Sequence, residues 1–523
     1  MTTAGNTVVD SPTGPAAAAP HRRGRTLGWS IALGVVVVTG AILAINLHRN
    51  GHNQGDDFAL YLRQARSIFD GDTAQVVADN RFAVLNSDFG FSPIAYPWGF
   101  PLLLSPFVKQ WGLDYGRLKL VEVACFCIWI VLVHGIVRRR VGRGIAIAIA
   151  AVLATAPILL LHTDQLLSEY PHAMVLAAWV WWLDHVLRRS PLIGASTRQL
   201  VTLGVLGAAA YNVRRESIIL IAVILVSQLV ELVRARRARP PAPVPWLTVA
   251  TPHLAFVGSI VLFQLLIPSM LIPDNGDSPG FVLERMGDFT GVLTQQLGIG
   301  EHPLIGNLIL LLAVAGMVVG CVKRPRLDVP LATLTVLTTL TVSTHFRIVG
   351  RYYFQVVPFI LYFAAAAIIA AVQALRSPEV RRAAVVVAMA PLLFLVGVHA
   401  ANLPSDLADV RDFNAGGRQQ SGPTNPDVAP IFDAVLQYTE PTATIAYYRA
   451  RTMTLYTDRR SIQTQSVDRM LQHADYFAQQ RFSSYFQPNI SEVDALGKGM
   501  VQVWADSRWI LWKLPGPPVF TPL

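Results

Sequence analysis

Long apolar stretches separated by polar segments fill residues 29–401 of the chain. The first stretch, from Trp29 to Leu47, contains no charged residue. Its length is close to the ~20 residues that a helix needs to cross the hydrocarbon layer of a membrane. Ten further stretches follow, at residues 115–137, 144–162, 171–188, 199–213, 216–233, 246–272, 303–322, 328–344, 352–375 and 383–401. The pattern therefore predicts an α-helical integral membrane protein with about eleven transmembrane helices.

The polar segments outside these stretches differ in length. Residues 1–28 form a tail rich in Thr, Ala and Pro, which cannot build a core and is expected to be disordered and cytoplasmic. A large first loop covers residues 48–114. Within it, the segment Trp98–Trp111 contains Pro101 and Pro106 and is too short to span comfortably. We expect this segment to be an interfacial helix.

Residues 402–523 have the composition of a soluble domain and follow the predicted transmembrane domain of residues 29–401. Their patterns predict a strand, a helix and a hairpin, at Ala443–Tyr448, Ser466–Gln480 and Met500–Leu514 respectively. We expect a small extracytoplasmic α/β domain. The resulting fold class is a helical membrane bundle that carries this domain at its carboxyl terminus.

Composition supports the membrane assignment and gives an orientation. Hydrophobic residues make up 53% of the chain and charged residues only 15%, against about 25% charged residues in soluble domains. With eleven spans, the basic clusters all fall on one side, at residues 22–25, 138–140, 188–189, 234–239, 323–326 and 376–382. Because basic loops stay inside, the amino terminus is expected to be cytoplasmic and the carboxyl terminus outside a bacterial plasma membrane. The net charge of +10 is then an orientation signal and does not indicate nucleic acid as a partner.

The strongest candidate chemistry is the acidic pair Asp56-Asp57, about ten residues after the first span. Two adjacent carboxylates repel one another, so one of them can have a raised pKa and act as a general base. The alternative is that either aspartate caps the helix predicted to follow it.

A second candidate lies between the third and fourth predicted spans, where Asp164 and Glu169 are expected at the outer face. The segment Ser168-Glu169-Tyr170-Pro171-His172 also has the pattern of a helix start. A carboxylate in a first helical turn interacts favourably with the helix dipole. Capping and function are therefore both open for these two acids.

Two clusters of arginines complete the set of candidates. Arg214 and Arg215 occupy a short outer turn beside Glu216, and Arg347 and Arg351 precede another predicted span. Arginine on the outer side opposes the usual bias and suits bidentate binding of a phosphate. Pairing with Glu216 is the alternative for the first cluster, and snorkelling to lipid headgroups is the alternative for both.

These carboxylates and arginines come from distant segments, yet all are expected at the same membrane boundary. Ionisable groups at that depth are functional candidates by default. A carboxylate base together with guanidinium groups suits displacement of a phosphate leaving group, because the arginines neutralise the charge that develops on it.

Several loose motifs occur in a fairly specific order, namely Asp57–Tyr61, Ala65-Arg66, Phe69–Gly71, Tyr96–Leu102, Ser168–Pro171, Arg214 or Arg215, Arg351-Tyr352, Pro358 and Ile445–Arg459. With this order of motifs, most of the chain resembles polytopic glycosyltransferases of the GT-C superfamily. The resemblance is to the group that includes protein O-mannosyltransferases and aminoarabinose transferases. It implies an inverting transferase that uses a polyprenyl-phosphate-linked sugar donor and a glycan, lipid or protein acceptor beside the membrane lipids.

The resemblance also implies roles for particular residues. The first-loop aspartate would be the general base; spacing to Tyr61 favours Asp57, and the acidic dipeptide leaves Asp56 as the alternative. Glu169 is the further catalytic candidate. The candidate substrate-binding residues are Tyr61, Arg66, Tyr96, His172, Arg214, Arg215, Arg347, Arg351 and Tyr352. No second acidic motif with metal-ligand character accompanies them, so no metal ligand or cofactor is assigned and a requirement for a divalent cation stays open.

Two other functions compete with glycosyl transfer. A lipid or solute transporter should have repeat-related halves and ionisable groups near the membrane midplane, whereas here the candidates gather at one boundary beside a soluble domain. A non-catalytic relative would bind lipid-linked sugars without turnover. The residues leave the donor sugar open; the Ala-, Arg-, Val- and Pro-rich composition is compatible with a high-GC actinobacterium and so with mannose or arabinose donors.

Overall fold

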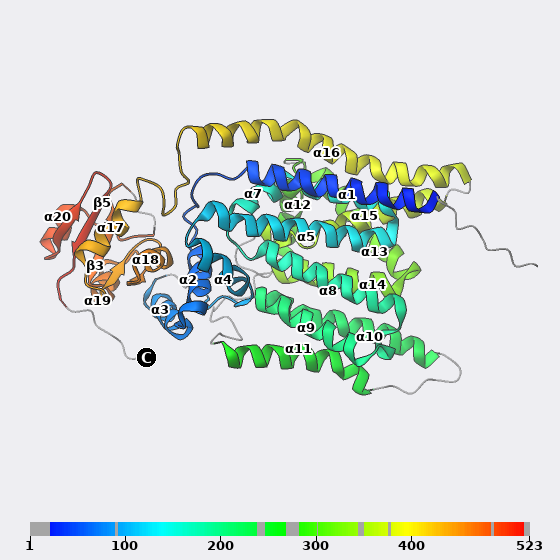
Figure 1. Cartoon of the computed structure of the whole chain (residues 1–523), viewed down its shortest axis with the longest axis horizontal. Coiled ribbons are helices and arrows are strands. Elements are labelled where there is room, and N and C mark those ends of the chain that lie inside the picture. The colour runs from blue at the N-terminus through cyan, green and yellow to red at the C-terminus, as the bar shows by residue number, and fades with distance from the viewer. Residues whose placement is uncertain are drawn as a thin grey trace, which may run out of the picture.

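Long helices lie side by side in the computed structural model, and a small sheet domain lies beyond one end of them (Figure 1). The structure describes residues 21–88, 93–237, 246–267, 282–300, 302–343, 350–374, 378–482 and 486–516. The predicted fold class is confirmed, since a helical bundle with apolar helices carries a small α/β domain near its carboxyl terminus.

The bundle begins with α1 (His21–Asn46) and continues after the first loop. Its other helices are α5 (Tyr115–Val141), α6 (Arg143–Thr155), α7 (Pro157–Leu161), α8 (Glu169–Arg189), α9 (Thr197–Val213), α10 (Leu220–Arg237), α11 (Trp246–Leu266), α12 (Val282–Gln296), α13 (Pro303–Lys323), α14 (Pro325–Ser343), α15 (Val357–Ala374) and α16 (Pro378–Ala415). Four short 3₁₀ helices connect them, η1 (His162–Asp164), η2 (Leu192–Gly194), η3 (Arg215–Ile219) and η4 (Gly350–Tyr353).

Each of the eleven predicted membrane stretches contains helical structure, whereas residues 268–272, 344 and 375 of these stretches lie outside the described residues. Among the described residues, seven helices are long and apolar enough to cross a membrane, and the bent pair α6–α7 makes eight if it is one span. The pair bends by 56° at its break, where Pro157 cannot donate the backbone hydrogen bond that would continue α6. Helix α9 has only 17 residues, and α8 and α14 carry more polar side chains. The number of spans therefore stays a prediction.

Close packing between bundle helices depends on glycines at two crossings. A Cβ atom on Gly316 of α13 would overlap the backbone of Phe363 in α15, and one on Gly204 of α9 would overlap the backbone of Pro252 in α11. Small residues at such crossings let two helix backbones approach closely, which is a common way for membrane helices to associate.

The first loop folds into three helices, α2 (Asp57–Asp70), α3 (Thr73–Asn86) and α4 (Gly99–Trp111). They lie between the bundle and the sheet domain (Figure 1). Helix α4 is the predicted interfacial segment, and its buried Phe100, Leu104 and Val108 belong to the same core as the bundle.

The sheet domain, which we call the C-terminal domain (residues 416–516), has the strand order β2-β1-β3-β5-β4. Its strands are β1 (Thr444–Ala446), β2 (Arg460–Ile462), β3 (Tyr476–Gln480), β4 (Val501–Ala505) and β5 (Trp509–Lys513), and its helices are α17 (Ala429–Tyr438), α18 (Ala450–Thr457), α19 (Val467–His473) and α20 (Glu492–Gly497). Strand β1 pairs in parallel with β2 and β3, while β5 pairs antiparallel with β3 and β4. Alternate residues of the strands enter two separate cores, so both faces of the sheet are covered.

Three boundaries differ from the prediction. Helix α1 already begins at His21, so residues 21–28 are helical and not part of a disordered tail; residues 1–20 lie outside the described residues. Helix α16 continues past residue 401 to Ala415. The segment Ser466–Gln480, predicted as one helix, holds both α19 and β3 because its second half enters the sheet. The strand predicted within Ala443–Tyr448 and the hairpin predicted within Met500–Leu514 are confirmed.

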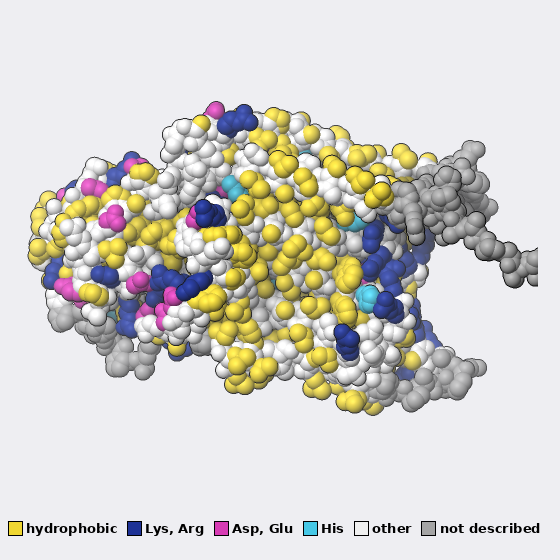
Figure 2. Space-filling view, viewed as in Figure 1, with side chains coloured by type: hydrophobic (Ala, Val, Ile, Leu, Met, Phe, Trp, Pro, Cys, Tyr) yellow, Lys and Arg dark blue, Asp and Glu magenta, His cyan; other side chains and the backbone are white. Residues whose placement is uncertain are grey.

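Lys and Arg side chains gather at the end of the bundle opposite the C-terminal domain (Figure 2). This distribution agrees with the predicted orientation, which stays a prediction.

A buried ion-pair cluster joins α5, α8 and α14. Arg140 donates to Asp184 Oδ1 at 2.6 Å and to Asp328 Oδ1 at 3.1 Å, and the side chains of all three are at most 2% exposed.

We predict that Arg140→Ala destabilises the bundle by about 3–5 kcal/mol, because it leaves two buried carboxylates without their shared partner. Thermal unfolding of the purified protein in detergent measures the effect. The matched control is Arg138→Ala, at an exposed position of the same helix, which should change the free energy of unfolding by less than about 0.5 kcal/mol. Equal losses in both variants would contradict the structural role of Arg140.

Candidate active site

Six charged side chains from separate segments form a chain of alternating sign between the bundle and the C-terminal domain. We call it the ion-pair chain, and its members in order are Glu216, Arg214, Glu169, Arg351, Asp57 and Arg451. Three carboxylates and three guanidinium groups balance one another, so the set as a whole is neutral.

The distances within the chain are those of direct ion pairs. Arg214 lies 2.8 Å from Glu216 Oε1 and 3.0 Å from Glu169 Oε1. Arg351 also reaches Glu169 Oε1, at 3.1 Å, and its other end lies 3.2 Å from Asp57 Oδ2. The guanidinium group of Arg451 is 4.0 Å from Asp57 Oδ1. Each inner member is thus shared between two partners of opposite charge.

Aromatic rings support the arginines of the ion-pair chain. The ring of Tyr352 lies under both Arg214 and Arg351, at 4.9 and 5.4 Å from their guanidinium carbons. Tyr96 lies under Arg451 at 5.2 Å and stacks on Tyr61 at 4.3 Å. A flat ring beneath a guanidinium group fixes its plane and leaves its edge available for oxygen acceptors.

Three members of the ion-pair chain lie at the ends of helices. Asp57 and Glu169 are the first residues of α2 and α8, and Arg214 follows the last residue of α9. A carboxylate in a first turn is favoured by the helix dipole. The sequence therefore brings Asp57 and Glu169 to helix starts, where Arg214 and Arg351 pair with them.

The two adjacent aspartates have different surroundings. The side chain of Asp57 is 37% exposed and accepts a hydrogen bond from the Tyr96 hydroxyl at 2.8 Å. Asp56 is buried, and its Oδ1 atom accepts from the backbone N–H and the hydroxyl of Thr452 at 3.2 and 3.1 Å. Asp57 therefore meets the solvent-facing side of the cluster, whereas Asp56 faces the C-terminal domain.

Their pKa values move in opposite directions. Burial raises the pKa of Asp56, despite the nearby Arg451 and Arg449. Burial also acts to raise the pKa of Asp57, but Arg351 and Arg451 outweigh it and hold that pKa below its usual value. Burial and Asp57 raise the pKa of Tyr96, so its phenol stays protonated and donates to Asp57.

The fold has counterparts among solved structures. No family model matches the chain, and no curated protein sequence matches it. ArnT from Cupriavidus metallidurans bound to undecaprenyl phosphate aligns with a TM-score of 0.54 and 14% identity, over 93% of this chain and 98% of that one. The Archaeoglobus fulgidus oligosaccharyltransferase in its apo form aligns with a TM-score of 0.51 and 11% identity, over 86% of this chain and 69% of that one. Both structures are GT-C membrane glycosyltransferases.

The chain has the GT-C fold. The predicted resemblance is thereby confirmed at the level of the fold.

Within this GT-C fold, seven of the predicted site residues come together. Asp57, Glu169, Arg214, Arg351, Tyr352, Tyr96 and Tyr61 form one cluster. The predicted alternative of a pair between Arg214 and Glu216 is also observed.

The other predicted residues lie outside the cluster. Arg66 pairs with Asp458 of the C-terminal domain, and Arg215 donates to the carbonyl oxygen of Ala95 at 3.3 Å. His172 is buried inside α8 and bonds the Ser217 hydroxyl at 2.7 Å. Arg347 lies outside the described residues. The alternative that either aspartate caps α2 is not observed as a side-chain cap: Asp56 holds the N-cap position but forms no side-chain bond to that helix.

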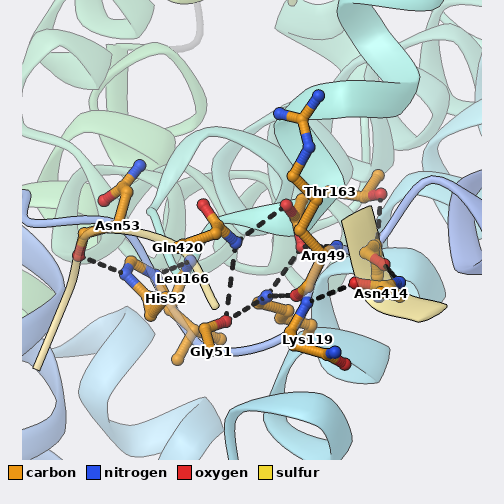
Figure 3. A network of polar contacts seen from close by, with 12 residues as sticks. Arg49, Gly51, His52, Asn53, Lys119, Thr163, Leu166, Asn414 and Gln420 are labelled. Carbon is orange, nitrogen blue, oxygen red and sulfur yellow. Dashed lines mark hydrogen bonds and ion pairs between the residues drawn. The ribbon is translucent and has the colours of Figure 1, made fainter. Parts of the chain in front are cut away.

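Asp164, the second acid of its segment, also has another role. It pairs with buried Lys119 at 2.6 Å and accepts from Gln420 at 3.0 Å. Figure 3 shows the surrounding network, in which Lys119 also donates to the carbonyl oxygens of Arg49 and Gly51. These contacts tie α5 and the first loop to the segment that follows α16. Asp164 therefore holds structural elements together and is separate from the ion-pair chain.

Arg451 is a member of the cluster that the sequence did not predict. The available signal was its place in Tyr447-Tyr448-Arg449-Ala450-Arg451, where an arginine lies among apolar residues of a soluble domain.

As for metals, no three His, Cys, Asp or Glu side chains come together as a cation site in the part of the chain that the structure describes. The carboxylates Asp57 and Glu169 bind arginines in this arrangement.

We predict that Asp56→Ala lowers the free energy of unfolding by about 1 kcal/mol, because the Thr452 N–H at the start of α18 loses its acceptor. Asp56→Asn should be at least as stable as wild type at pH 8. An amide oxygen can still accept that bond, and the buried carboxylate with its raised pKa opposes folding once it is ionised. Thermal unfolding of both variants at pH 8 tests this, and a lower melting temperature for Asn than for Ala would contradict it.

Proposed function

We propose that the protein transfers a sugar from a polyprenyl-phosphate-linked donor to an acceptor hydroxyl at the outer face of a bacterial plasma membrane. The observation that carries the proposal is Asp57, a partly exposed carboxylate beside Arg351 and Arg451 at the junction of an apolar bundle and a soluble domain. ArnT and the oligosaccharyltransferase AglB, which share the fold, were solved with undecaprenyl phosphate and a dolichol-phosphate respectively. These ligands are consistent with a lipid-phosphate donor here.

Asp57 would act as the general base. Its carboxylate accepts the proton of the acceptor hydroxyl while that oxygen attacks the anomeric carbon of the donor sugar. The bond between this carbon and the phosphate oxygen breaks on the opposite face, so the configuration inverts. The phosphate leaves with an additional negative charge, which Arg351 and Arg214 neutralise.

The shared position of Arg351 would couple donor binding to the base. A donor phosphate that takes bonds from Arg351 would weaken the ion pair with Asp57 Oδ2, which lies 3.2 Å from this guanidinium group. The pKa of Asp57, held low by Arg351 and Arg451, then rises toward that of an effective base. The carboxylate would thus become more basic when the donor is in place.

Asp57→Asn should lower kcat for sugar transfer by about 100-fold or more, because the amide cannot accept the proton. Transfer is measured with purified protein and a panel of radiolabelled polyprenyl-phosphate sugars, including hexosyl and pentosyl donors. The matched variant is Asp56→Asn, which changes the neighbouring carboxylate and should retain activity within about tenfold.

Full activity of Asp57→Asn would exclude Asp57 as the base. Tight binding of the donors without transfer by the wild-type protein would instead favour a non-catalytic binder of lipid-linked sugars. Donor movement across vesicle membranes without transfer would favour a transporter.

Arg351→Lys should lower kcat/KM for the donor by about tenfold or more, because lysine keeps the charge but cannot bridge a phosphate and Glu169 with a planar fork. It should also weaken inhibition by free polyprenyl phosphate. Arg481→Lys, which alters an arginine paired with Glu492 inside the C-terminal domain, is the control and should leave kcat/KM unchanged. Unchanged donor kinetics in Arg351→Lys would contradict its role at the phosphate.

A further inference from the structure

Arg451 belongs to the C-terminal domain but lies in the wall of the candidate active site. It occupies the first turn of α18, and only 4% of the residue is exposed. A buried guanidinium group is costly unless several acceptors and an opposite charge compensate for its lost hydration. Its contacts therefore indicate what it does there.

Three hydrogen bonds from Arg451 go to the first loop. Its Nε donates to Asn80 Oδ1 at 3.1 Å, and one terminal nitrogen donates to the Pro93 carbonyl oxygen at 2.8 Å. The other terminal nitrogen donates to the Tyr96 hydroxyl at 3.2 Å. The planar fork thus binds three separate points of one loop, a geometry that a lysine cannot reproduce.

The same guanidinium group acts on Asp57 in two ways. It forms the 4.0 Å ion pair with Asp57 Oδ1, and it holds the Tyr96 hydroxyl that donates to this oxygen at 2.8 Å. Asp57 is also faced by Arg351 from η4 and by Tyr61 from its own helix, with Glu169 beyond Arg351 and Asp56 next in the chain. Arg451 is the member of this group that the C-terminal domain supplies.

Asp56 provides a joint between the two parts. Its carboxylate comes from the first loop and accepts bonds from the backbone N–H and hydroxyl of Thr452, the residue after Arg451. A helix of one domain is therefore capped by a side chain of the other. The cap fixes the first turn of α18, and with it the origin of the Arg451 side chain.

We propose that Arg451 is a positioning residue of the transfer reaction, through which the C-terminal domain holds Tyr96 and Asp57 in their working geometry, with the Asp56 cap of α18 as the joint. This inference rests on the proposed function and extends it, since it makes the C-terminal domain a part of the active site. Loss of the Arg451 charge should raise the pKa of Asp57, because one of the two cations that hold it low is removed.

The test compares Arg451→Met and Arg451→Lys in the full-length protein, with kcat/KM for transfer measured between about pH 5 and 9. A base is active when deprotonated, so activity falls as the pH drops through its pKa. Arg451→Met should move this acidic limb upward by about one pH unit and lower kcat at least tenfold. Arg451→Lys should keep the limb near its wild-type position, because the charge remains, yet still lower kcat because the three loop contacts are lost.

The matched control is Arg460→Met. Arg460 pairs with Asp79 of the first loop at 3.1 Å, so it joins the same two parts without an ion pair to Asp57. Its variant should lower stability without moving the acidic limb. If Arg451→Met also leaves the acidic limb at its wild-type pH and has wild-type kcat, the proposal is overturned. Arg451 would then only join the C-terminal domain to the first loop.

If Arg451→Met does not fold, the kcat of Arg451→Lys tests the positioning role. A wild-type kcat in Arg451→Lys would then overturn the proposal. Absence of transfer by the wild-type protein with every lipid-linked donor of the panel would overturn the proposed function, and this inference with it. The two failures are therefore distinguishable.

Discussion

The pairing of charges at one end of an apolar bundle is the constraint on which the rest of the structure depends. A carboxylate or guanidinium group that is largely removed from water must find an opposite charge or be neutralised. In the ion-pair chain, Glu169 and Asp57 each meet two arginines. These arginines come from η4, the end of α9 and the C-terminal domain. Satisfying the charges therefore fixes how three separate parts of the chain meet, at the partly exposed carboxylate of Asp57.

Apolar periodicity predicted the bundle well because lipid imposes a strong length and composition rule on each span. The rule weakens where a helix is screened from lipid by its neighbours. Helix α8, which begins with Glu169 of the ion-pair chain, is mostly buried against other helices, so it tolerates polar residues that a lipid-facing span would not. The error at Ser466–Gln480 has a different cause. A seven-residue helix and a five-residue strand follow each other there, and neither is long enough to establish its own period.

Part of the candidate site could be predicted, because helix starts and ends have recognisable sequence patterns. Asp57 was found through the acidic pair that follows the first span, Glu169 through the helix start that contains it, and the outer arginines because they oppose the expected charge bias. The spacing to Tyr61 favoured Asp57 over Asp56, but the sequence could not show how the surroundings of the two carboxylates differ. Their difference arises from Thr452, almost 400 residues away in the chain, and no local pattern reports such a contact. Arg451 was missed for the same reason, since its partners Asn80 and Tyr96 belong to another part of the chain.

The neutrality of the ion-pair chain has a consequence for what it can bind. A neutral lipid gains little from a set in which every charge is already balanced, whereas a phosphate can replace Asp57 as a partner of Arg351. Such an exchange keeps the guanidinium group paired throughout, so the desolvation cost of a lone buried charge never arises. The displaced carboxylate is not stranded either, because Tyr96 still donates to it and Arg451 stays 4.0 Å away. In the proposed reaction, Arg351 would pair with the donor phosphate while Arg451 would keep the Asp57 carboxylate in place.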